Sequence, residues 1–412
     1  MQDAKLAVSH AFKIFGNDAP AVLKLLRQGK SKQEILAQTG ATVGVQDASF
    51  EVREGEIFVV MGLSGSGKST LVRMLNGLIP PTAGQILIGG EDIAQASPAA
   101  LRRIRRDKIS MIFQHFALFP HWTLAENVAY GLKINGVPRE SRHKRALEVL
   151  EQVGLAPWAD SLPSDLSGGM QQRVGLARGL AAGSDILLMD EPFGALDPLI
   201  RREMQMELLN LQQTLKKTIV FITHDLNEAL LLGNRIAIMK DGCIVQIGTA
   251  QEIVTAPADD YVAAFVADID RGRVFTADDV SSQPTTIQLR QTSVRDALRM
   301  MEQGGAHALY VMDGERVAGV VTYQQLAASE MDPSPTTTLQ DALITDFPTV
   351  DASTSLSELY GAAGSGLPIA VTDERERLVA VVEPSDVLAH LSGDAVAAEA
   401  LANKEQANAQ PR

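Results

Sequence analysis

The sequence predicts an α/β protein of two or three domains, in which a buried parallel sheet is followed by a smaller α/β module made of two repeats. Two apolar runs, residues 57–61 and 186–189, each end in residues typical of an anion or metal site. The third observation is a repeat in the last third of the chain, at an offset of about 61 to 62 residues. The length of 412 residues exceeds the usual single-domain range, and a hydrophobic content of 45% is enough for more than one core.

The first apolar run leads directly into a glycine-rich loop. Residues 62–70 read Gly-Leu-Ser-Gly-Ser-Gly-Lys-Ser-Thr and fit the phosphate-binding pattern G-x-x-x-x-G-K-[ST]. Glycines let backbone N–H groups curl around an anion, and the helix expected to begin near Lys68 points its positive end at the phosphates. We expect Lys68 to hold the β and γ phosphates and Ser69 to ligate Mg²⁺. The alternative is an ordinary strand, turn and helix, and the position of the loop directly after a strand argues against it. The expected nucleotide-binding residues of this loop are Gly62, Ser64, Gly65, Ser66, Gly67, Lys68, Ser69 and Thr70.

The second apolar run ends in two carboxylates. Residues 186–189 predict a buried strand with Asp190 at its tip, where a carboxylate can hold Mg²⁺ through its water shell. Glu191 follows at once and is the candidate general base, because a carboxylate beside a metal-bound phosphate can polarise an attacking water. Acidic turn residues after a buried strand are the alternative, which the phosphate-binding loop in the same chain makes less favoured.

A third motif, residues 166–173, opens a helix with Ser167, Gly168 and Gly169 and so provides a second anion-binding N-terminus. With these motifs in this order, the sequence resembles the ATPase subunits of ABC transporters over residues 1–268. The resemblance implies a P-loop NTPase cassette, with a RecA-like core and a helical subdomain at about 118–179, that uses ATP and Mg²⁺. It also implies a head-to-tail dimer with a second copy of the chain, in which Ser167, Gly168 and Gly169 of one subunit close over ATP held by the other. Met170 departs from the commonest signature, which has Gln there.

The same resemblance assigns further residues. Gln114 matches the glutamine loop, which touches Mg²⁺ and senses the membrane subunit, and Asp197 matches the aspartate loop. His224 matches the histidine that contacts the γ phosphate, and Phe15 matches the aromatic residue that stacks on adenine. The expected catalytic residues are Glu191, His224, Gln114 and Lys68, and the expected metal ligands are Ser69, Gln114 and Asp190.

An insertion at about residues 17–42 narrows the family. Ser31 and Glu34 fit a capping box and Gly40 fits a helix stop, so the segment predicts a short helical pair. With residues 59–68, 71–76 and 113–121, the insertion resembles ATPase subunits of glycine betaine, proline betaine and choline uptake systems. That likeness implies an integral membrane permease as partner, an indirect role for a solute-binding protein, and a peripheral position on the cytoplasmic face of the inner (plasma) membrane. The expected docking residues for the permease are His115, Phe116, Phe119 and His121.

The last third of the chain contains the repeat. Residues 271–393 resemble a tandem CBS module with repeats at about 276–330 and 338–392, each predicted as helix, strand, turn, strand and helix. Of the Thr/Ser and Asp pair that often binds an adenine nucleotide, the first repeat has Thr322 but Gln325, and the second has Glu383 and then Asp386. We favour a structural, dimerising or ionic-strength-sensing module, and a regulatory nucleotide such as a cyclic dinucleotide stays open.

Charge supports the ionic-strength hypothesis. From Arg271 onward the chain has 20 acidic and 10 basic side chains, and fields between exposed charges weaken as salt shortens the screening length. If salt gates ATP use through this module, transport by a chain truncated after Asp268 should lose its salt dependence. Residues 394–412 predict a frayed helix or a flexible tail.

Composition excludes other classes. A net charge of −13 argues against a nucleic-acid partner, because phosphate backbones favour positive surfaces. The sequence has no run of about 18 apolar residues and no basic-then-apolar leader, so we expect a chain without membrane spans that is not secreted. Its single cysteine, Cys243, excludes an intrachain disulfide and fits a reducing cytosol as a packed, unreactive side chain. The basic segment 101–106 predicts a solvated helix face, with anionic lipid or an acidic partner as the alternative.

The function that these residues favour is the energy-coupling ATPase of an importer for glycine betaine, proline betaine or a related compatible solute. The same residues leave open an importer ATPase for an amino acid or another small solute, since the cargo does not touch this chain. A soluble ABC-type ATPase of translation or DNA repair is less favoured. Such translation factors usually fuse two cassettes and repair relatives insert a long coiled coil, and this chain has neither.

Overall fold

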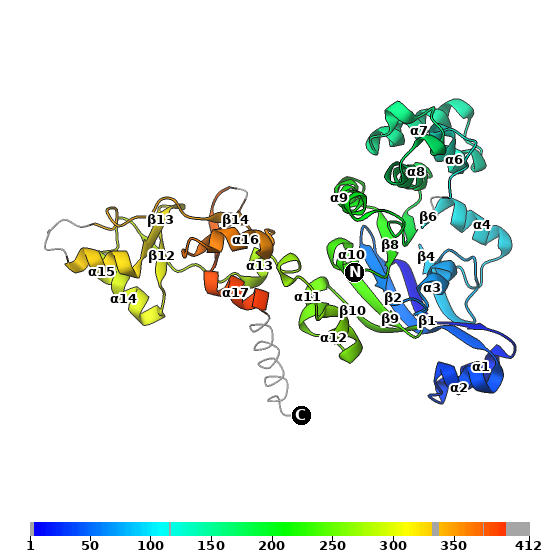
Figure 1. The fold of residues 1–412 in the computed structure, drawn as a ribbon, viewed down its shortest axis with the longest axis horizontal. Helices are drawn as coiled ribbons and strands as arrows, with labels where there is room; N and C mark the ends of the chain where they lie inside the picture. Colours follow the sequence, from blue (N-terminus) through cyan, green and yellow to red (C-terminus); the bar gives the residue numbers. More distant parts are fainter. Residues whose placement is uncertain (1–3, 115–116, 332–337, 374, 393–412) are drawn as a thin grey trace. The chain divides into compact units, whose positions relative to one another are not determined.

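The chain forms two compact units in the computed structural model, which describes residues 4–114, 117–331, 338–373 and 375–392 (Figure 1). The first unit comprises Met1–Ile253 and Pro257–Ala267, and the second comprises Val254–Ala256 and the chain from Asp268 onward. None of the helices in the described ranges is both long and apolar enough to cross a bilayer.

A six-stranded sheet, in the order β10-β9-β3-β8-β7-β6, is the centre of the first unit. Its members are β3 (Ile57–Met61), β6 (Ile109–Phe113), β7 (Ile186–Asp190), β8 (Thr218–Thr223), β9 (Arg235–Lys240) and β10 (Cys243–Gly248). The strands from β9 to β6 pair in parallel, and only β10 is antiparallel to its neighbour. Every residue of β3 and β8 is buried, as expected for parallel strands covered on both faces. The carboxyl ends of β3, β7 and β8 therefore meet at one edge of the sheet.

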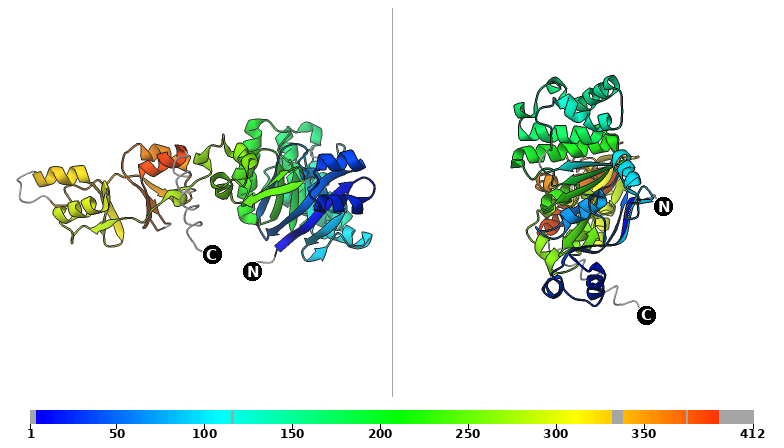
Figure 2. Two further views of the ribbon diagram at one scale, coloured as in Figure 1. Left: turned by 90° about the horizontal axis from the view of Figure 1, so that it is seen from below. Right: turned by 90° about the vertical axis from the view of Figure 1, so that its right-hand side faces the viewer.

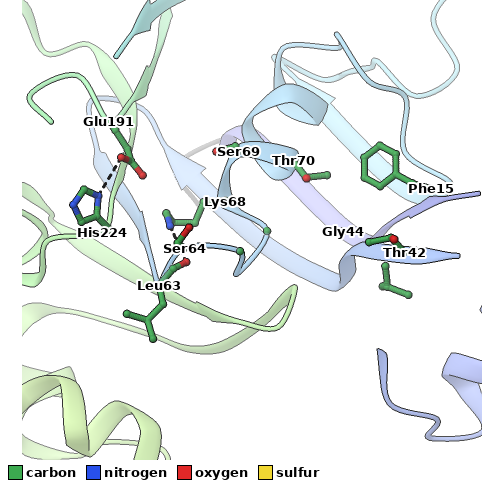
Figure 3. A pocket seen from close by; sticks show the side chains of 13 residues that line it. Phe15, Thr42, Gly44, Leu63, Ser64, Lys68, Ser69, Thr70, Glu191 and His224 are labelled. Atoms are coloured by element: carbon green, nitrogen blue, oxygen red, sulfur yellow. Dashed lines mark hydrogen bonds and ion pairs between the residues drawn. The ribbon is translucent and has the colours of Figure 1, made fainter. Parts of the chain in front are cut away.

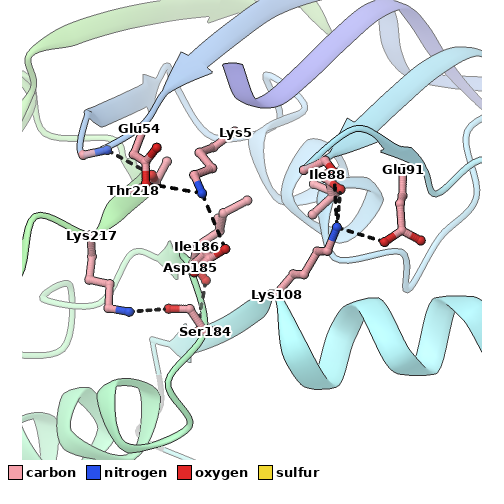
Figure 4. Close-up of polar contacts among 12 residues, drawn as sticks. Lys5, Glu54, Ile88, Glu91, Lys108, Ser184, Asp185, Ile186, Lys217 and Thr218 are labelled. Atoms are coloured by element: carbon pink, nitrogen blue, oxygen red, sulfur yellow. Dashed lines mark hydrogen bonds and ion pairs between the residues drawn. The ribbon is translucent and has the colours of Figure 1, made fainter. Parts of the chain in front are cut away.

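A second, antiparallel sheet packs on the first. It has the order β2-β1-β4-β5 and consists of β1 (Ala4–Phe15), β2 (Thr42–Arg53), β4 (Ala83–Ile88) and β5 (Glu91–Asp92). Both sheets contribute to one core with α3 (Lys68–Leu75), and in that core the ring of Phe50 stacks on Phe58 with centroids 4.9 Å apart. Lys5 of β1 lies between Glu54 and Asp185, with Nζ to carboxylate distances of 3.3 and 3.6 Å (Figure 4). These ion pairs join the antiparallel sheet to the loop that precedes β7.

The insertion after β1 is the predicted helical pair, α1 (Ala19–Arg27) and α2 (Lys32–Thr39). The predicted capping box is present, since the Ser31 hydroxyl accepts from the Glu34 N–H and the Glu34 carboxylate accepts from the Ser31 N–H. Gly40 ends α2 with a left-handed φ of 68°. Val22, Leu26 and Ile35 pack the pair against β1 and β2 in a separate small core.

A helical subdomain follows β6. It contains α5 (Leu124–Val128), α6 (Tyr130–Ile134), α7 (Arg139–Gln152) and α8 (Gly168–Ala181), and α4 (Pro98–Asp107) precedes β6. Figures 1 and 2 show this subdomain and the α1–α2 pair at opposite ends of the first unit. The first unit also contains α9 (Pro198–Leu215), α10 (Leu226–Leu232) and α12 (Asp260–Val266), and α11 (Ala250–Thr255) spans the boundary between the two units in the sequence. Cys243 is a half-buried free cysteine, and burial raises the pKa of its thiol.

The second unit contains two copies of one pattern. The first copy is β11 (Thr286–Gln288), α14 (Val294–Gly304), β12 (Ala308–Asp313), β13 (Arg316–Thr322) and α15 (Tyr323–Met331). The second is β14 (Thr349–Asp351), α16 (Leu356–Ala363), β15 (Ile369–Thr372), β16 (Leu378–Val382) and α17 (Pro384–Ser392). The predicted helix, strand, strand, helix order is present in both. The three-residue strands β11 and β14 were not predicted, because they are too short to show a period. A short helix, α13 (Ala277–Val280), packs on α17 and β16 of the second copy.

The two repeats share a small core of Tyr310, Val320, Ala370 and Val381. The Tyr310 ring is fully buried, and its hydroxyl donates to the Pro368 carbonyl at 2.7 Å. A single side chain of the first repeat thus reaches the backbone of the second. The predicted tail, 394–412, lies outside the described residues.

Replacing Tyr310 by Phe removes this hydrogen bond and leaves a buried carbonyl without its donor. We expect the free energy of unfolding of the second unit to fall by about 1 kcal/mol. Scanning calorimetry of the full chain should show the transition of that unit about 4 °C lower. The control is Tyr360→Phe, because Tyr360 is 64% exposed. Equal shifts in the two variants would contradict the structural role of the Tyr310 hydroxyl.

Candidate nucleotide site

A cavity of about 560 Å³ opens where β3, β7 and β8 end, and the end of β1 and the start of β2 form its far side (Figure 3). It brings together many of the residues that the sequence predicted, from five separate parts of the chain. The lining residues are Phe15, Thr42, Val43, Gly44, Leu63, Ser64, Gly65, Gly67, Lys68, Ser69, Thr70, Glu191 and His224.

Sequence reasoning missed the part contributed by β2. A Cβ on Gly44 would lie 2.9 Å from the Phe15 ring and 3.0 Å from the Thr70 side chain, so only glycine lets these two side chains approach the strand. No local pattern marks Thr42, Val43 or Gly44, because their place in the cavity comes from the pairing of β2 with β1.

The phosphate-binding loop depends on its glycines. Gly67 has a φ of 107°, and a Cβ there would lie 2.5 Å from the Gly44 carbonyl oxygen. A Cβ on Gly62 would lie 2.2 Å from the Met239 carbonyl oxygen. Helix α3 begins at Lys68 with Gly67 as its N-cap, and glycine has no side chain to cap the first N–H groups. These donors remain for an anion at the helix N-terminus. Ser66 belongs to the loop, and its Oγ is buried without a hydrogen-bond partner among the described residues.

Lys68 is 5% exposed, and its ammonium lies on the loop. Nζ donates to the carbonyl oxygens of Gly62 at 2.7 Å and Leu63 at 3.1 Å. Burial lowers the pKa of Lys68, and the charges of Glu191 and Asp190 oppose that shift. A phosphate oxygen would give this buried cation a better counter-charge than the two carbonyls provide.

Glu191 and His224 meet on the opposite wall of the cavity. The Glu191 carboxylate Oε2 lies 3.1 Å from His224 Nδ1 (Figure 3). Glu191 has a left-handed φ of 45°, which is uncommon for a residue with a Cβ, and its N–H donates to the Ile222 carbonyl. This backbone turn holds the carboxylate in the cavity.

Asp190 is at the tip of β7 and is not among the residues that line the cavity. Burial, and then the charge of Glu191, raise the pKa of Asp190 above its ordinary 3.8, while Arg73 and Lys68 lower it. Its carboxylate is therefore partly desolvated and in the electrostatic reach of Lys68. A divalent cation would relieve this unfavourable burial.

Four other predicted residues lie away from the cavity. Ser167 caps α8, where its Oγ accepts from the Met170 N–H at 3.4 Å, and Gly168 is exposed at that helix end. Gly169 is buried against Ile200. Asp197 caps α9 by accepting from the Ile200 N–H. Within one chain the Ser167 motif and Asp197 thus do not reach the phosphate-binding loop.

Gln114 follows β6 and is half-buried. Its amide Nε2 would lie 3.3 Å from a Cβ on Gly194, so it packs beside the turn that follows Glu191. Of the predicted docking residues, His115 and Phe116 lie outside the described residues. Phe119 packs its ring on Trp122 and Tyr130, with centroids 4.6 and 4.7 Å away, and His121 is exposed.

The donors present suit a metal that arrives with the nucleotide. In the ranges that the structure describes, no three His, Cys, Asp or Glu side chains are grouped as a metal site. The Ser69 hydroxyl and the Asp190 carboxylate are oxygen donors, and Mg²⁺ usually takes one or two protein oxygens together with phosphates and water. Phe15, 40% exposed at the mouth of the cavity, has a ring available for a base.

A second cavity, of about 400 Å³, is basic. Arg102, Arg105 and Arg106 of α4 line it together with Arg178 of α8. Arg178 donates to the Ala117 carbonyl at 2.6 Å, and Arg105 Nε is buried with no hydrogen-bond partner in the part of the chain that the structure describes. The segment 101–106 is thus not simply a solvated face, because part of it forms a pocket between the core and the helical subdomain.

Comparison with known proteins gives matches over both units. A family model described as ABC transporter matches residues 45–194, and one described as CBS domain matches residues 277–331. The glycine betaine transport ATP-binding protein OpuAA of Bacillus subtilis is 50% identical over 393 residues, which are 95% of this chain and 93% of OpuAA. The glycine betaine/proline betaine transport system ATP-binding protein ProV of Salmonella typhimurium is 48% identical over 383 residues, or 92% of this chain and 95% of ProV. The structure of cbiO1 from Clostridium perfringens, part of the ABC transporter complex cbiONQ, has a TM-score of 0.52 and 25% identity, and the match covers 62% of this chain and 92% of cbiO1.

The raised pKa of Asp190 predicts a pH-dependent effect of Asp190→Asn. The folded chain holds this proton more tightly than the unfolded chain does, so stability falls as the pH rises from 3.8 through the raised pKa. Because Asn does not ionise, we expect the nucleotide-free variant to be more stable than the wild type at neutral pH, with the difference shrinking toward about pH 4. Urea unfolding across this pH range without Mg²⁺ measures the difference.

The control for that experiment is Asp107→Asn, which has the opposite sign. Arg106 lowers the pKa of Asp107, so this variant should lose stability relative to the wild type as the pH rises. If nucleotide-free Asp190→Asn were less stable than the wild type at neutral pH, the burial argument for Asp190 would be wrong.

Proposed function

This chain belongs to the ATP-binding subunits of ABC transporters, and from that premise we propose that it hydrolyses ATP to drive import of glycine betaine, proline betaine or a related compatible solute. The observation that carries the ATPase part is the contact of 3.1 Å between Glu191 Oε2 and His224 Nδ1, across the cavity from the phosphate-binding loop. A base and its orienting partner thus face the place where the loop would hold a γ phosphate.

Each wall of the cavity has a separate task in this proposal. The N–H groups at the start of α3 and the Lys68 ammonium bind the β and γ phosphates, and Phe15 stacks on adenine. Ser69, Asp190 and Gln114 hold Mg²⁺, which when bound neutralises charge on the phosphate oxygens. Glu191 orients and polarises the attacking water, and His224 holds Glu191 in place and supports the γ phosphate.

We infer that the complete site needs a second copy of the chain. Ser167 and Gly168 are exposed at the start of α8, a helix of 14 residues whose N-terminus lies apart from the cavity of its own chain. In a head-to-tail dimer this N-terminus, with Asp197, would close over the nucleotide of the other subunit. ATP binding would then draw the two copies together.

The membrane partner in this proposal is an integral permease, with the chain bound peripherally on the cytoplasmic face. The basic cavity supports a docking place, because its arginines would pair with an acidic side chain of a cytoplasmic permease segment. Arg178 lines this cavity from α8, and its guanidinium donates to the carbonyl of Ala117.

Glu191→Gln tests the ATPase mechanism. We expect the variant to bind ATP as the wild type does and to hydrolyse it at least about a hundredfold more slowly, because the amide cannot take a proton. Phosphate release gives the hydrolysis rate, and titration with a fluorescent ATP analogue gives binding. Glu151→Gln, an exposed change on α7, is the matched control and should behave as the wild type. Fast steady hydrolysis by Glu191→Gln would remove Glu191 from this role.

Uptake of labelled solutes tests the cargo. In a strain that lacks this subunit, the wild-type gene should restore uptake of glycine betaine and proline betaine, and Glu191→Gln should not, because the transporter then lacks its energy source. Arg105→Glu should also fail to restore uptake while the purified chain keeps its ATPase activity, since it reverses one charge of the docking cavity. Restored uptake of an amino acid, with no betaine uptake, would overturn the cargo proposal while leaving the ATPase proposal intact.

A further inference from the structure

A buried polar cluster lies directly behind His224, and the proposed mechanism does not use it. Glu228 of α10 is 6% exposed, and its two carboxylate oxygens accept from different elements. The Thr223 hydroxyl at the end of β8 donates to Oε2 at 2.6 Å, and the Gln205 amide of α9 donates to Oε1 at 2.9 Å. Thr223 and Gln205 are themselves buried. One carboxylate thus joins three elements.

The cluster also fixes the backbone on the far side of His224. The Asp225 N–H donates to the Thr223 hydroxyl at 2.9 Å, while that hydroxyl donates to Glu228. The residue before His224 and the residue after it are therefore tied to the same carboxylate. His224 itself has a side chain that is 59% exposed, and its ring nitrogen contacts Glu191.

A second, weaker connection runs parallel to the first. Arg201 of α9 lies 3.8 Å from the Asp225 carboxylate and donates to the Leu196 carbonyl at 3.1 Å. Leu196 precedes Asp197, the N-cap of α9. Helix α9 therefore holds the His224 turn at two places, through Gln205 and through Arg201. The N-cap of the same helix is Asp197.

Burial of the Glu228 carboxylate has an unfavourable desolvation free energy. Burial raises the pKa of Glu228, and the bonds from Thr223 and then Gln205 lower it. Two donors to one buried carboxylate give strong and directional bonds, which fix geometry more tightly than packing of apolar side chains would. Apolar residues of similar volume could fill the space but would leave the His224 turn without these directional ties.

We propose that Glu228 is a positioning residue for ATP hydrolysis. It fixes the turn that carries His224 against α9, so that the His224 ring stays in contact with the Glu191 carboxylate. Glu228 lies behind this turn and does not line the nucleotide cavity, so it acts through His224. The proposal rests on the proposed function, because it requires His224 to act during ATP hydrolysis.

The test compares Glu228→Ala, Glu228→Gln and a matched control in the purified full chain. The control is Ser184→Ala, because this change removes a buried hydrogen bond of 2.8 Å to Ser110 at a residue that is 1% exposed. Among the described residues, the Ser184 hydroxyl bonds to Ser110 and to the Ile186 carbonyl rather than to the His224 turn. We expect Glu228→Ala to lower kcat for ATP by about tenfold or more with KM nearly unchanged, since the phosphate-binding loop stays intact. Ser184→Ala should leave kcat and KM unchanged.

Glu228→Gln should recover most of the lost rate. The Gln carbonyl can accept from Thr223, and its amide can donate to Gln205 once the Gln205 amide turns over. If Glu228→Ala fails to fold, Thr223→Val removes the same tie with an isosteric side chain and should show the same loss of kcat. An equal loss for the Ala and Gln variants, or a change in KM alone, would overturn the proposal.

Hydrogen exchange of the Asp225 amide gives a readout that is independent of activity, because this N–H donates to Thr223. Exchange should be faster in Glu228→Ala and unchanged in Ser184→Ala. Unchanged exchange in both would show that Glu228 does not hold the turn. Failure of the proposed function is separate: it would appear as no hydrolysis by the wild type, or as full activity of Glu191→Gln, whatever the exchange rates.

Discussion

The parallel pairing of β3, β8 and β7 is the constraint on which the nucleotide site depends. Met61 lies opposite Thr223, and Asp190 lies opposite Ile222, so the residues that follow these strands leave the sheet side by side. Gly62, Glu191 and His224 are each the next residue after a buried strand. A shift of register by one residue would turn every side chain of a strand to the other covered face, and the close packing on both faces would be lost. The sheet core therefore fixes the separation of the phosphate-binding loop and the proposed base.

Two charged side chains of the site, Lys68 and Asp190, are buried or half-buried, and their burial is unfavourable in the nucleotide-free chain. Lys68 is buried on carbonyl oxygens, and Asp190 has a raised pKa beside Glu191. Each of these groups is less well solvated than it would be on the surface. A phosphate would offset the burial penalty of Lys68, and a divalent cation would offset that of Asp190. Relief of this burial penalty contributes to the binding of a charged ligand.

Two helices near the site, α8 and α9, also carry residues that are expected to contact partner proteins. Helix α9 has Asp197 as its N-cap and holds the His224 turn through Gln205 and Glu228. Arg178 of α8 donates to the Ala117 carbonyl at the edge of a basic cavity. Asp197, which is expected to contact a second subunit, thus lies at the start of the helix that holds the His224 turn. The second unit has its own cores, joined at Tyr310, and so is built as a separate module.

The sequence by itself determined the features whose cause is local. The glycine-rich loop, the Asp190 and Glu191 pair, the capping box at Ser31 and the repeated pattern after Asp268 could be predicted, because each depends on neighbours within a few residues. Only the tertiary structure decided which distant groups meet: Gly44 beside Phe15, Phe119 inside an aromatic cluster, and Glu228 between Thr223 and Gln205. These contacts depend on strand register and on helix packing between segments far apart in the chain. No local pattern in the sequence predicts which side chains of such segments will be in contact.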